Sequence, residues 1–169
     1  MIKAIVAVDL KWGIGKNNDL LFHLPEDMKF FRATTLDKVV IMGSNTLLSF
    51  SGSKPLPKRV NIVLWPGGEK REDCTVVGSL DELKQELKKY ADREIFVIGG
   101  AMFYRTMLPY CESVLVTKVK ADGGAQVFFE NLDALPSWSC VSASKPVVSG
   151  EYEIVFTEYR NANPQKFID

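Results

Sequence analysis

The 169-residue sequence has a single histidine, His23, and three widely separated cysteines that form no Cys-x-x-Cys pair. One histidine excludes a histidine pair and nearly excludes a Ser-His-Asp triad. Three scattered cysteines argue against a disulfide scaffold or a zinc site and fit a reducing cytoplasm. We therefore expect a cytoplasmic protein without a metal site, in which His23 is a surface or packing residue.

The sequence also lacks net charge, long apolar runs and a targeting signal. Lys+Arg and Asp+Glu both number 21, so charge does not draw the protein toward nucleic acid or an acidic membrane. No apolar stretch approaches the length that spans a bilayer, and no signal peptide precedes Ile2. These absences favour a small-molecule partner over nucleic acid or membrane.

Apolar runs typical of buried strands alternate with helical segments along most of the chain. Strands are expected at 2–8, 38–42, 59–64, 74–77, 94–98 and 113–119, and helices from Pro25 and at 46–50, 80–90 and 101–108. Segments 138–142 and 152–159 follow one another without a helix, which predicts an antiparallel hairpin. The predicted fold is a single α/β domain over residues 1–169, with a core at 1–160 and a C-terminal tail at 161–169. Its central, mostly parallel twisted sheet is flanked by helices, and the hairpin is added at the C-terminal end.

The stretch from Leu20 to Phe31 carries the first candidate for chemistry. Pro25 suits the first turn of a helix because its missing N–H would be unpaired there. Leu24, Met28 and Phe31 recur at helical spacing and are expected to face the interior. Asp27 either complements the positive end of the helix dipole or is the one ionised anchor of an apolar ligand pocket.

Two glycine-bearing junctions, 43–46 and 99–100, each stand between a predicted strand and a helix. Backbone N–H groups at such junctions can hold phosphate, so the pair could bind the two ends of a dinucleotide. Neither junction is a G-x-G-x-x-G motif, and tight strand-to-helix packing is the alternative. Residues 9–19 contain two glycines and two asparagines, and they form either an ordinary connection or a lid.

Two polar side chains have both an ordinary and a functional interpretation. Arg59 follows the rigid Pro55-Leu56-Pro57 turn, and it either faces solvent or presents its guanidinium to a carboxylate. Thr117 lies within an apolar strand, where it either satisfies its own backbone or steadies a partner of Asp27 across the sheet.

Together these motifs resemble the dihydrofolate reductase family over almost the whole chain, from Ile2 to about Tyr159. Eight clusters in the order and spacing of that family carry the resemblance: Ala7-Val8-Asp9, Gly13-Ile14-Gly15, Leu24-Pro25-Glu26-Asp27 with Phe31 and Thr35, Val40-Ile41-Met42-Gly43 with Thr46, Pro55-Leu56-Pro57 with Arg59, Asn61-Ile62, Val97-Ile98-Gly99-Gly100 with Tyr104, and Thr117. The resemblance implies hydride transfer from NADPH to 7,8-dihydrofolate, giving tetrahydrofolate.

The same resemblance implies a role for individual residues. Asp27 anchors the pteridine, Thr117 buttresses it, a water protonates N5, and residues 14–20 form a mobile lid over the nicotinamide. The implied catalytic residues are Asp27, Thr117, Leu20 and Phe22. The implied substrate-binding residues are Ile5, Asp27, Met28, Phe31, Phe50, Leu56, Arg59, Ile98, Tyr104 and Thr117, with Arg59 on the α-carboxylate of the glutamate tail. The implied cofactor-binding residues are Ala7, Ile14, Gly15, Asn18, Leu20, Gly43, Ser44, Asn45, Thr46, Leu64, Trp65, Gly99, Gly100, Ala101, Met102, Phe103 and Tyr104.

The sequence departs from the family pattern on the cofactor side. Ser44 stands where the family usually has the arginine or lysine that meets the 2′-phosphate of NADPH. Trp65-Pro66 stands where a serine, threonine or arginine often contacts the same phosphate. Loss of a charge-assisted hydrogen bond typically costs about 1.5–3 kcal/mol, so NADH is not excluded as the cofactor. Lys70 or Arg71 could take over the contact.

Two more departures lie near the predicted lid. Phe22 replaces a common tryptophan and loses the indole N–H that could hold a water. Ala125-Gln126 replaces the Gly-Asp that helps to hold the lid closed, although Gln126 could still hydrogen-bond the lid without a charge. Two alternatives therefore stay open: a related pterin reductase with relaxed NADH/NADPH preference, and a folate- or nucleotide-binding protein with little turnover. A monomer is the common state in the family and is expected here.

Overall fold

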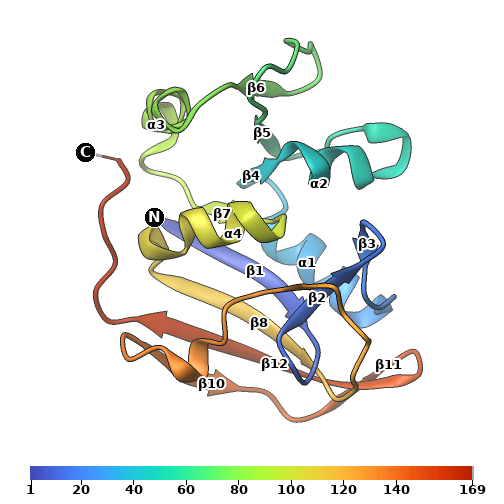
Figure 1. Cartoon of the computed structure of the whole chain (residues 1–169). Coiled ribbons are helices and arrows are strands. Elements are labelled where there is room, and N and C mark those ends of the chain that lie inside the picture. Colours follow the sequence, from blue (N-terminus) through green and yellow to red (C-terminus); the bar gives the residue numbers. More distant parts are fainter. Residues whose placement is uncertain (169) are drawn as a thin grey trace.

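A nine-stranded mixed sheet organises the molecule, and a computed structural model describes it for residues 1–168 (Figure 1). Its strands lie in the order β10-β12-β8-β1-β7-β4-β5-β6, and β11 pairs with β12. Their bounds are β1 Ile2–Val8, β4 Val39–Gly43, β5 Val60–Leu64, β6 Thr75–Val77, β7 Ile95–Val97, β8 Ser113–Val119, β10 Trp138–Ala143, β11 Val147–Ser149 and β12 Tyr152–Asn161. Pairing is parallel from β8 to β6, and β12 is antiparallel to β8, β10 and β11. The predicted α/β fold is confirmed.

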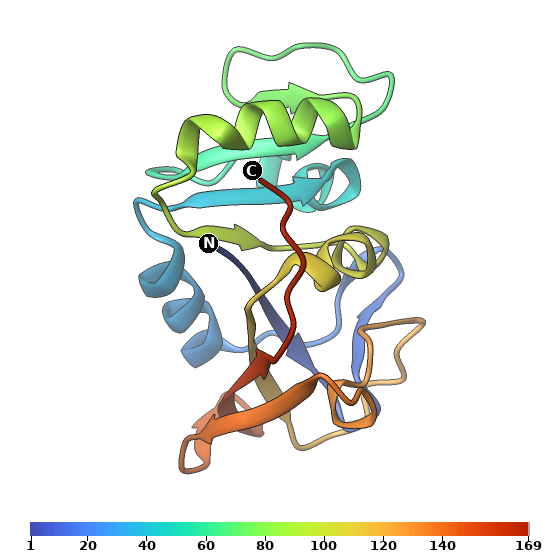
Figure 2. The same ribbon diagram turned by 90° about the vertical axis from the view of Figure 1, so that its left-hand side faces the viewer.

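Helices cover both faces of this sheet (Figures 1 and 2). The α-helices are α1 Pro25–Thr35, α2 Ser44–Ser49, α3 Leu80–Leu87 and α4 Ala101–Met107, and the 3₁₀ turns are η1 Ser51–Ser53, η2 Lys88–Tyr90, η3 Leu108–Tyr110 and η4 Leu132–Ala134. Helices α3 and α4 contribute to one buried cluster, and α1 and α2 contribute to another. No helix within residues 1–168 is long and apolar enough to cross a membrane.

Strand β4 shows why the apolar runs of the sequence become central strands. Val39, Val40, Ile41 and Met42 are all fully buried. Val39 and Ile41 belong to the cluster on the side of α3 and α4, whereas Val40 and Met42 belong to the cluster on the side of α1 and α2. A strand between two helical layers has no solvent face, so its sequence is continuously apolar instead of alternating.

Local capping explains two helix starts. Helix α1 begins at Pro25, as predicted. Helix α3 begins with the predicted contact in which the backbone N–H of Glu82 donates to Ser79 Oγ over 3.1 Å. The Glu82 carboxylate accepts from Gly78 N at 2.6 Å, one residue earlier than in the standard reciprocal box.

Two expectations about helices were wrong. Helix α2 begins at Ser44 and not at Thr46, because Gly43 is itself the extended N-cap residue and no side chain caps the helix. The side chain of Met28 is 55% exposed and does not face the interior. Helix α1 turns Phe30 and Phe31 toward the sheet, and this leaves Met28 at its margin.

Residues 9–19 were expected to form a loop, but they contain a short strand. Strand β2 (Gly13–Lys16) pairs with β3 (Asp19–Leu20) and with β9 (Val127–Phe128) in a separate three-stranded sheet. The sequence of β2 is short, contains two glycines and does not show the alternation typical of a strand. Its strand conformation therefore depends on pairing with the distant segment β9. Figure 1 shows β2 and β3 beside the carboxyl end of β1.

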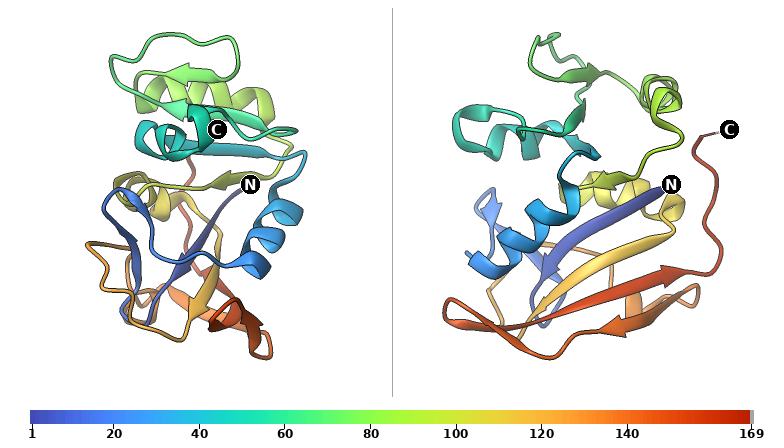
Figure 3. Two further views of the ribbon diagram at one scale, coloured as in Figure 1. Left: turned by 90° about the vertical axis from the view of Figure 1, so that its right-hand side faces the viewer. Right: turned by 180° about the vertical axis from the view of Figure 1, so that it is seen from behind.

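The chain beyond β12 runs back along the α3 and α4 side of the molecule (Figure 3, right). Phe167 is buried there, stacks edge-on against Tyr110 and lies beneath the ammonium of Lys84. Asp169, the last residue of the expected tail, lies outside the described residues. The division into a core and a C-terminal tail stays a prediction.

Candidate active site

The first turn of α1 places Asp27 directly over strand β8. Thr117 Oγ1, buried in the middle of β8, donates a hydrogen bond to Asp27 Oδ1 over 2.6 Å. Two contacts hold the helix in this position: Phe30 stacks on Phe156 with ring centroids 4.7 Å apart, and Ser149 Oγ accepts from Glu26 N at 2.9 Å. The side chain of Asp27 therefore pairs across the sheet and does not cap its own helix.

The environment of Asp27 makes its charge costly. Burial raises the pKa of the Asp27 carboxyl, and the hydrogen bond from Thr117 acts in the opposite direction. Among residues 1–168, the ion pairs that form involve other acids. A half-buried carboxylate with one oxygen bound to Thr117 can accept hydrogen bonds from an amino-bearing ligand through its other oxygen.

An apolar surface extends from Asp27 along the same face of the sheet. Five predicted pocket residues belong to one cluster there: Ile5, Phe31, Phe50, Leu56 and Ile98. Leu115 of β8 joins this cluster and was missed by the sequence analysis, because nothing in the alternation of β8 distinguishes it from its neighbours. These side chains can enclose a flat, largely apolar ligand.

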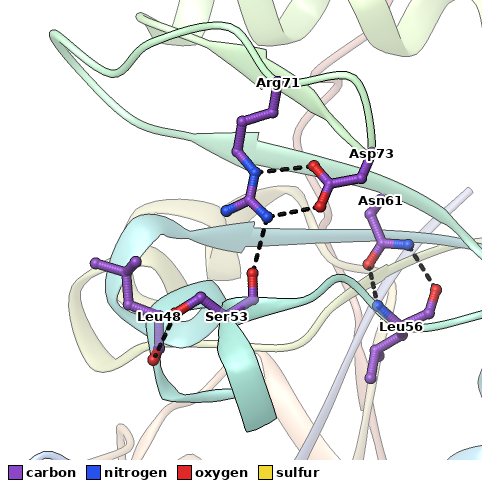
Figure 4. A network of polar contacts seen from close by, with 6 residues as sticks. All are labelled: Leu48, Ser53, Leu56, Asn61, Arg71 and Asp73. Atoms are coloured by element: carbon purple, nitrogen blue, oxygen red, sulfur yellow. Dashed lines mark hydrogen bonds and ion pairs between the residues drawn. The ribbon is translucent and has the colours of Figure 1, made fainter.

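Arg59 lies at the far end of this surface in a fixed position. Its Nε donates to Thr35 Oγ1 at 3.2 Å, and its Nη1 donates to Pro57 O at 2.9 Å. The buried Asn61 clamps the preceding turn, accepting from Leu56 N at 3.0 Å and donating to Leu56 O at 2.9 Å (Figure 4). Burial, followed by the nearby Arg32, lowers the pKa of Arg59. A partly desolvated guanidinium held in this way is suited to bind a carboxylate.

The two glycine junctions meet at the carboxyl ends of the neighbouring strands β4 and β7. Gly43 N donates to Gly99 O over 2.8 Å, so the ends of β4 and β7 touch. Gly99 has φ +138°, and a Cβ there would lie 2.9 Å from Thr46 Oγ1. Only glycine allows this approach, which leaves a backbone-lined cradle that fits the phosphates of a dinucleotide.

The start of α4 fixes one more predicted cofactor residue. Tyr104 is buried, and its hydroxyl donates to Ile5 O over 2.7 Å. Burial raises the pKa of Tyr104, so this hydroxyl stays a donor. Met102, at the first turn of the same helix, is exposed.

Comparison with known proteins identifies the family to which this arrangement belongs. The sequence model of the family described as dihydrofolate reductase matches residues 1–161. Dihydrofolate reductase of Bacillus subtilis is 34% identical over 169 residues, covering 98% of both chains. Dihydrofolate reductase of Haemophilus influenzae is 33% identical over 165 residues, covering 98% of this chain and 91% of that protein. The chain belongs to the dihydrofolate reductase family.

A solved dihydrofolate reductase structure has the same fold. The Enterococcus faecalis enzyme, complexed with NADP(H) and RAB-propyl, matches with a TM-score of 0.82 at 29% identity, over 96% of this chain and 97% of that chain. The predicted family, fold and enzyme class are confirmed by these matches, and the NADP(H) bound to the Enterococcus faecalis enzyme agrees with the expected NADPH cofactor. The individual site residues stay predictions, since none of the matches tests them.

The predicted lid of this dihydrofolate reductase fold lies against residues 121–126, here called the facing loop. Asn17 N donates to Gln126 Oε1 over 2.9 Å, and Gln126 N donates to Gly15 O over 2.8 Å. The expected hydrogen bond from Gln126 to the lid is therefore present. Leu20 is 78% exposed. Phe22 stacks edge-on against Tyr152 with centroids 4.8 Å apart.

The two cations that could replace the missing one at Ser44 have partners inside the protein. Arg71 donates to both carboxylate oxygens of Asp73, at 2.8 and 2.6 Å, and to Ser53 O at 2.8 Å (Figure 4). Lys70 Nζ donates to Val76 O at 2.7 Å. Arg71 is therefore held by an ion pair, whereas Lys70 contacts a neutral carbonyl and keeps N–H donors for an anion.

Within residues 1–168, no three His, Cys, Asp or Glu side chains are arranged to hold a metal ion.

Proposed function

We propose that this chain reduces 7,8-dihydrofolate to tetrahydrofolate through a site centred on Asp27 and Thr117. The observation that supports this is the 2.6 Å hydrogen bond between a buried hydroxyl and a half-buried carboxylate beside an apolar surface. When bound, NADPH would supply the hydride, and the residues of this chain bind and orient the two ligands.

Asp27 acts as the anchor of the pteridine ring. Its free carboxylate oxygen accepts from the amino group and N3 side of the ring, which fixes the ring's orientation and favours the electron distribution that accepts a proton at N5. Thr117 occupies the other oxygen, so the carboxylate cannot rotate away. A water provides the proton at N5, because the Asp27 carboxylate is engaged with the amino group and N3 side of the ring.

The remaining residues position the two ligands. Arg59 pairs with the α-carboxylate of the glutamate tail, and the apolar cluster of Ile5, Phe31, Phe50, Leu56 and Ile98 encloses the rings. Gly43–Thr46 and Gly99–Phe103 hold the pyrophosphate and its neighbouring groups. Residues 14–20 cover the nicotinamide and exclude water from it.

The test is turnover of the Asp27→Asn variant, measured as the loss of NADPH absorbance in the presence of dihydrofolate. The variant keeps the shape of the side chain but loses its charge, and we expect kcat/KM to fall by about a hundredfold or more. Equal turnover in the variant and the parent would overturn the role of Asp27. An inactive parent that still binds folate would favour the alternative of a binding protein with little turnover.

A second candidate is a reductase that uses NADH nearly as well as NADPH. The observation that favours it is the ion pair of Arg71 with Asp73, which engages one of the two cations that could replace the missing one at Ser44. The ratio of kcat/KM for the two cofactors decides between the candidates.

We also propose that the enzyme works as a monomer in the cytoplasm, without nucleic acid or membrane partners. The free state of Cys74, Cys111 and Cys140 supports a reducing compartment. Light scattering at micromolar concentration tests the monomer, and a dimer mass would contradict it.

A further inference from the structure

Asp9 is a buried acid at the end of β1 that the proposed reaction does not use. Its side chain is 4% exposed and accepts three hydrogen bonds, all from backbone N–H groups. Oδ1 accepts from Lys11 at 2.8 Å and from Gly13 at 2.7 Å. Oδ2 accepts from Gly123 at 3.0 Å. A carboxylate satisfied in this way is stable without a cationic partner.

The three donors come from two segments that are far apart in the sequence. Lys11 and Gly13 lead into the predicted lid, whereas Gly123 belongs to the facing loop. Each carboxylate oxygen holds one segment, so Asp9 joins the two. The backbone reinforces this junction, because Leu10 N donates to Ala121 O over 3.0 Å.

The atoms around Asp9 are closely packed, so no space remains between the two segments at this point. A Cβ on Gly13 would lie 2.9 Å from both carboxylate oxygens of Asp9 and 2.3 Å from Cβ of Ala125. The lid and the facing loop therefore approach each other as closely as their backbones allow. A substitution that alters the Asp9 carboxylate is therefore expected to displace both segments.

Gln126 and Asp122 make further side-chain links between the same two segments. Gln126 accepts a single hydrogen bond from Asn17 N, and Asp122 pairs with Lys11 at 3.0 Å. Both links are exposed to solvent, where a neutral hydrogen bond or an ion pair stabilises less than charge-assisted hydrogen bonds to a buried carboxylate. Asp9 is therefore the strongest of these links.

We propose that Asp9 is the positioning residue that holds the lid closed against the facing loop. The proposal rests on the proposed function only in assigning residues 14–20 to the nicotinamide. Asp9 touches neither ligand and acts through the backbone of Gly13 and Gly123. Release of its hydrogen bonds should loosen the cover over the cofactor and leave the dihydrofolate side unchanged.

The test compares Asp9→Asn with Asp122→Asn. Asp122 lies in the facing loop and loses the same charge, but it is exposed and pairs with the exposed Lys11 at 3.0 Å. We expect Asp9→Asn to speed NADPH dissociation about tenfold or more and to slow single-turnover hydride transfer by a similar factor. The KM for dihydrofolate should change by less than about threefold, because Asp27 and Arg59 are not affected. For Asp122→Asn, the rate of NADPH dissociation, the rate of hydride transfer and the KM for dihydrofolate should each stay within about twofold of the parent.

Three results would overturn the proposal. One is an Asp9→Asn variant with a lowered Tm but parent-like NADPH dissociation and hydride transfer, which would make Asp9 merely structural. Another is an equal rise in KM for both ligands. The third is a Gln126→Leu variant with a larger effect than Asp9→Asn.

Amide hydrogen exchange in the unmodified protein tests the same junction if Asp9→Asn does not fold. We expect the Gly13 and Gly123 amides to exchange at matching rates and to be slowed together by NADPH. Exchange of Gly123 about tenfold faster than Gly13 would overturn the proposal. NADPH dissociation and exchange remain measurable in a protein without reductase activity, so failure of the proposed function is distinguishable from failure of this inference.

Discussion

Thr117 Oγ1 donates to Asp27 Oδ1 over 2.6 Å, although the two residues are 90 positions apart in the chain. Burial raises the pKa of Asp27, and this hydrogen bond opposes the rise. The contact therefore favours the ionised form of a carboxylate that its surroundings disfavour.

Replacement of Thr117 by valine removes the opposing hydrogen bond and keeps the shape of the side chain. The pKa of Asp27 should rise further, so the acid limb of the pH profile of kcat/KM should move to higher pH. We expect kcat/KM at neutral pH to fall about tenfold or more. Thr157→Val is the matched control, because the Thr157 hydroxyl donates to Val116 O in the neighbouring strand and not to a carboxylate. An unshifted acid limb in Thr117→Val would contradict the prediction.

Replacement of Asp27 by asparagine should stabilise the fold while it removes activity. The folded state binds a proton at Asp27 more readily than the unfolded chain does, so the parent loses stability as pH rises through the unfolded and then the folded pKa. We expect Asp27→Asn to be about 0.5–2 kcal/mol more stable than the parent at neutral pH. Urea unfolding at neutral pH and well below the ordinary carboxyl pKa measures this difference, which should vanish in acid.

Asp122→Asn is expected to have the opposite effect on stability, because the pKa of Asp122 is shifted in the opposite direction to that of Asp27. Its backbone partner Gly124 and the ammonium of Lys11 lower the pKa of Asp122, so loss of the charge should slightly destabilise the folded state at neutral pH. A stabilising effect of Asp122→Asn as large as that of Asp27→Asn would mean that net charge, and not burial of Asp27, is responsible.

Cofactor preference is expected to be weak in the parent and to respond to a single substitution. With Arg71 bound to Asp73, the ratio of kcat/KM for NADPH over NADH should be below about a hundredfold. Ser44→Arg should raise that ratio about tenfold or more by adding a cation for the 2′-phosphate. Ser44→Gln is the control of similar length without a charge. A parent that already prefers NADPH by more than a hundredfold would contradict the prediction.

Asn61 should affect substrate binding without touching substrate. Loss of its bonds to Leu56 in Asn61→Ala frees the turn that presents Arg59, and we expect KM for dihydrofolate to rise about tenfold with kcat nearly unchanged. The effect should disappear with a substrate that lacks the glutamate tail, because Arg59 then has no carboxylate to bind. An equal rise in KM for dihydrofolate and for the substrate without the glutamate tail would instead indicate a general disturbance of the pocket.

The features that depend on neighbouring residues could be predicted from the amino-acid sequence alone. Runs such as 39–42 are apolar at every position, which only a doubly covered strand requires. Pro25 and Ser79 start helices through the unpaired N–H groups of the first turn, a local effect. One family has the same order of motifs along the chain as the two glycine junctions, Asp27 and Arg59. This order was sufficient to predict the fold and the reaction.

Which of these residues come into contact depends on the way the chain folds. Strand order and register bring Thr117 to Asp27, and the pairing of β2 with β9 turns an expected loop into a strand. Asn17 and Gln126 are 109 positions apart, and the bond between Arg71 and Asp73 shows that a cation present in the sequence has a partner within the protein. Contacts of this kind depend on the placement of whole elements and on competition between partners, and residue type and local spacing do not specify either.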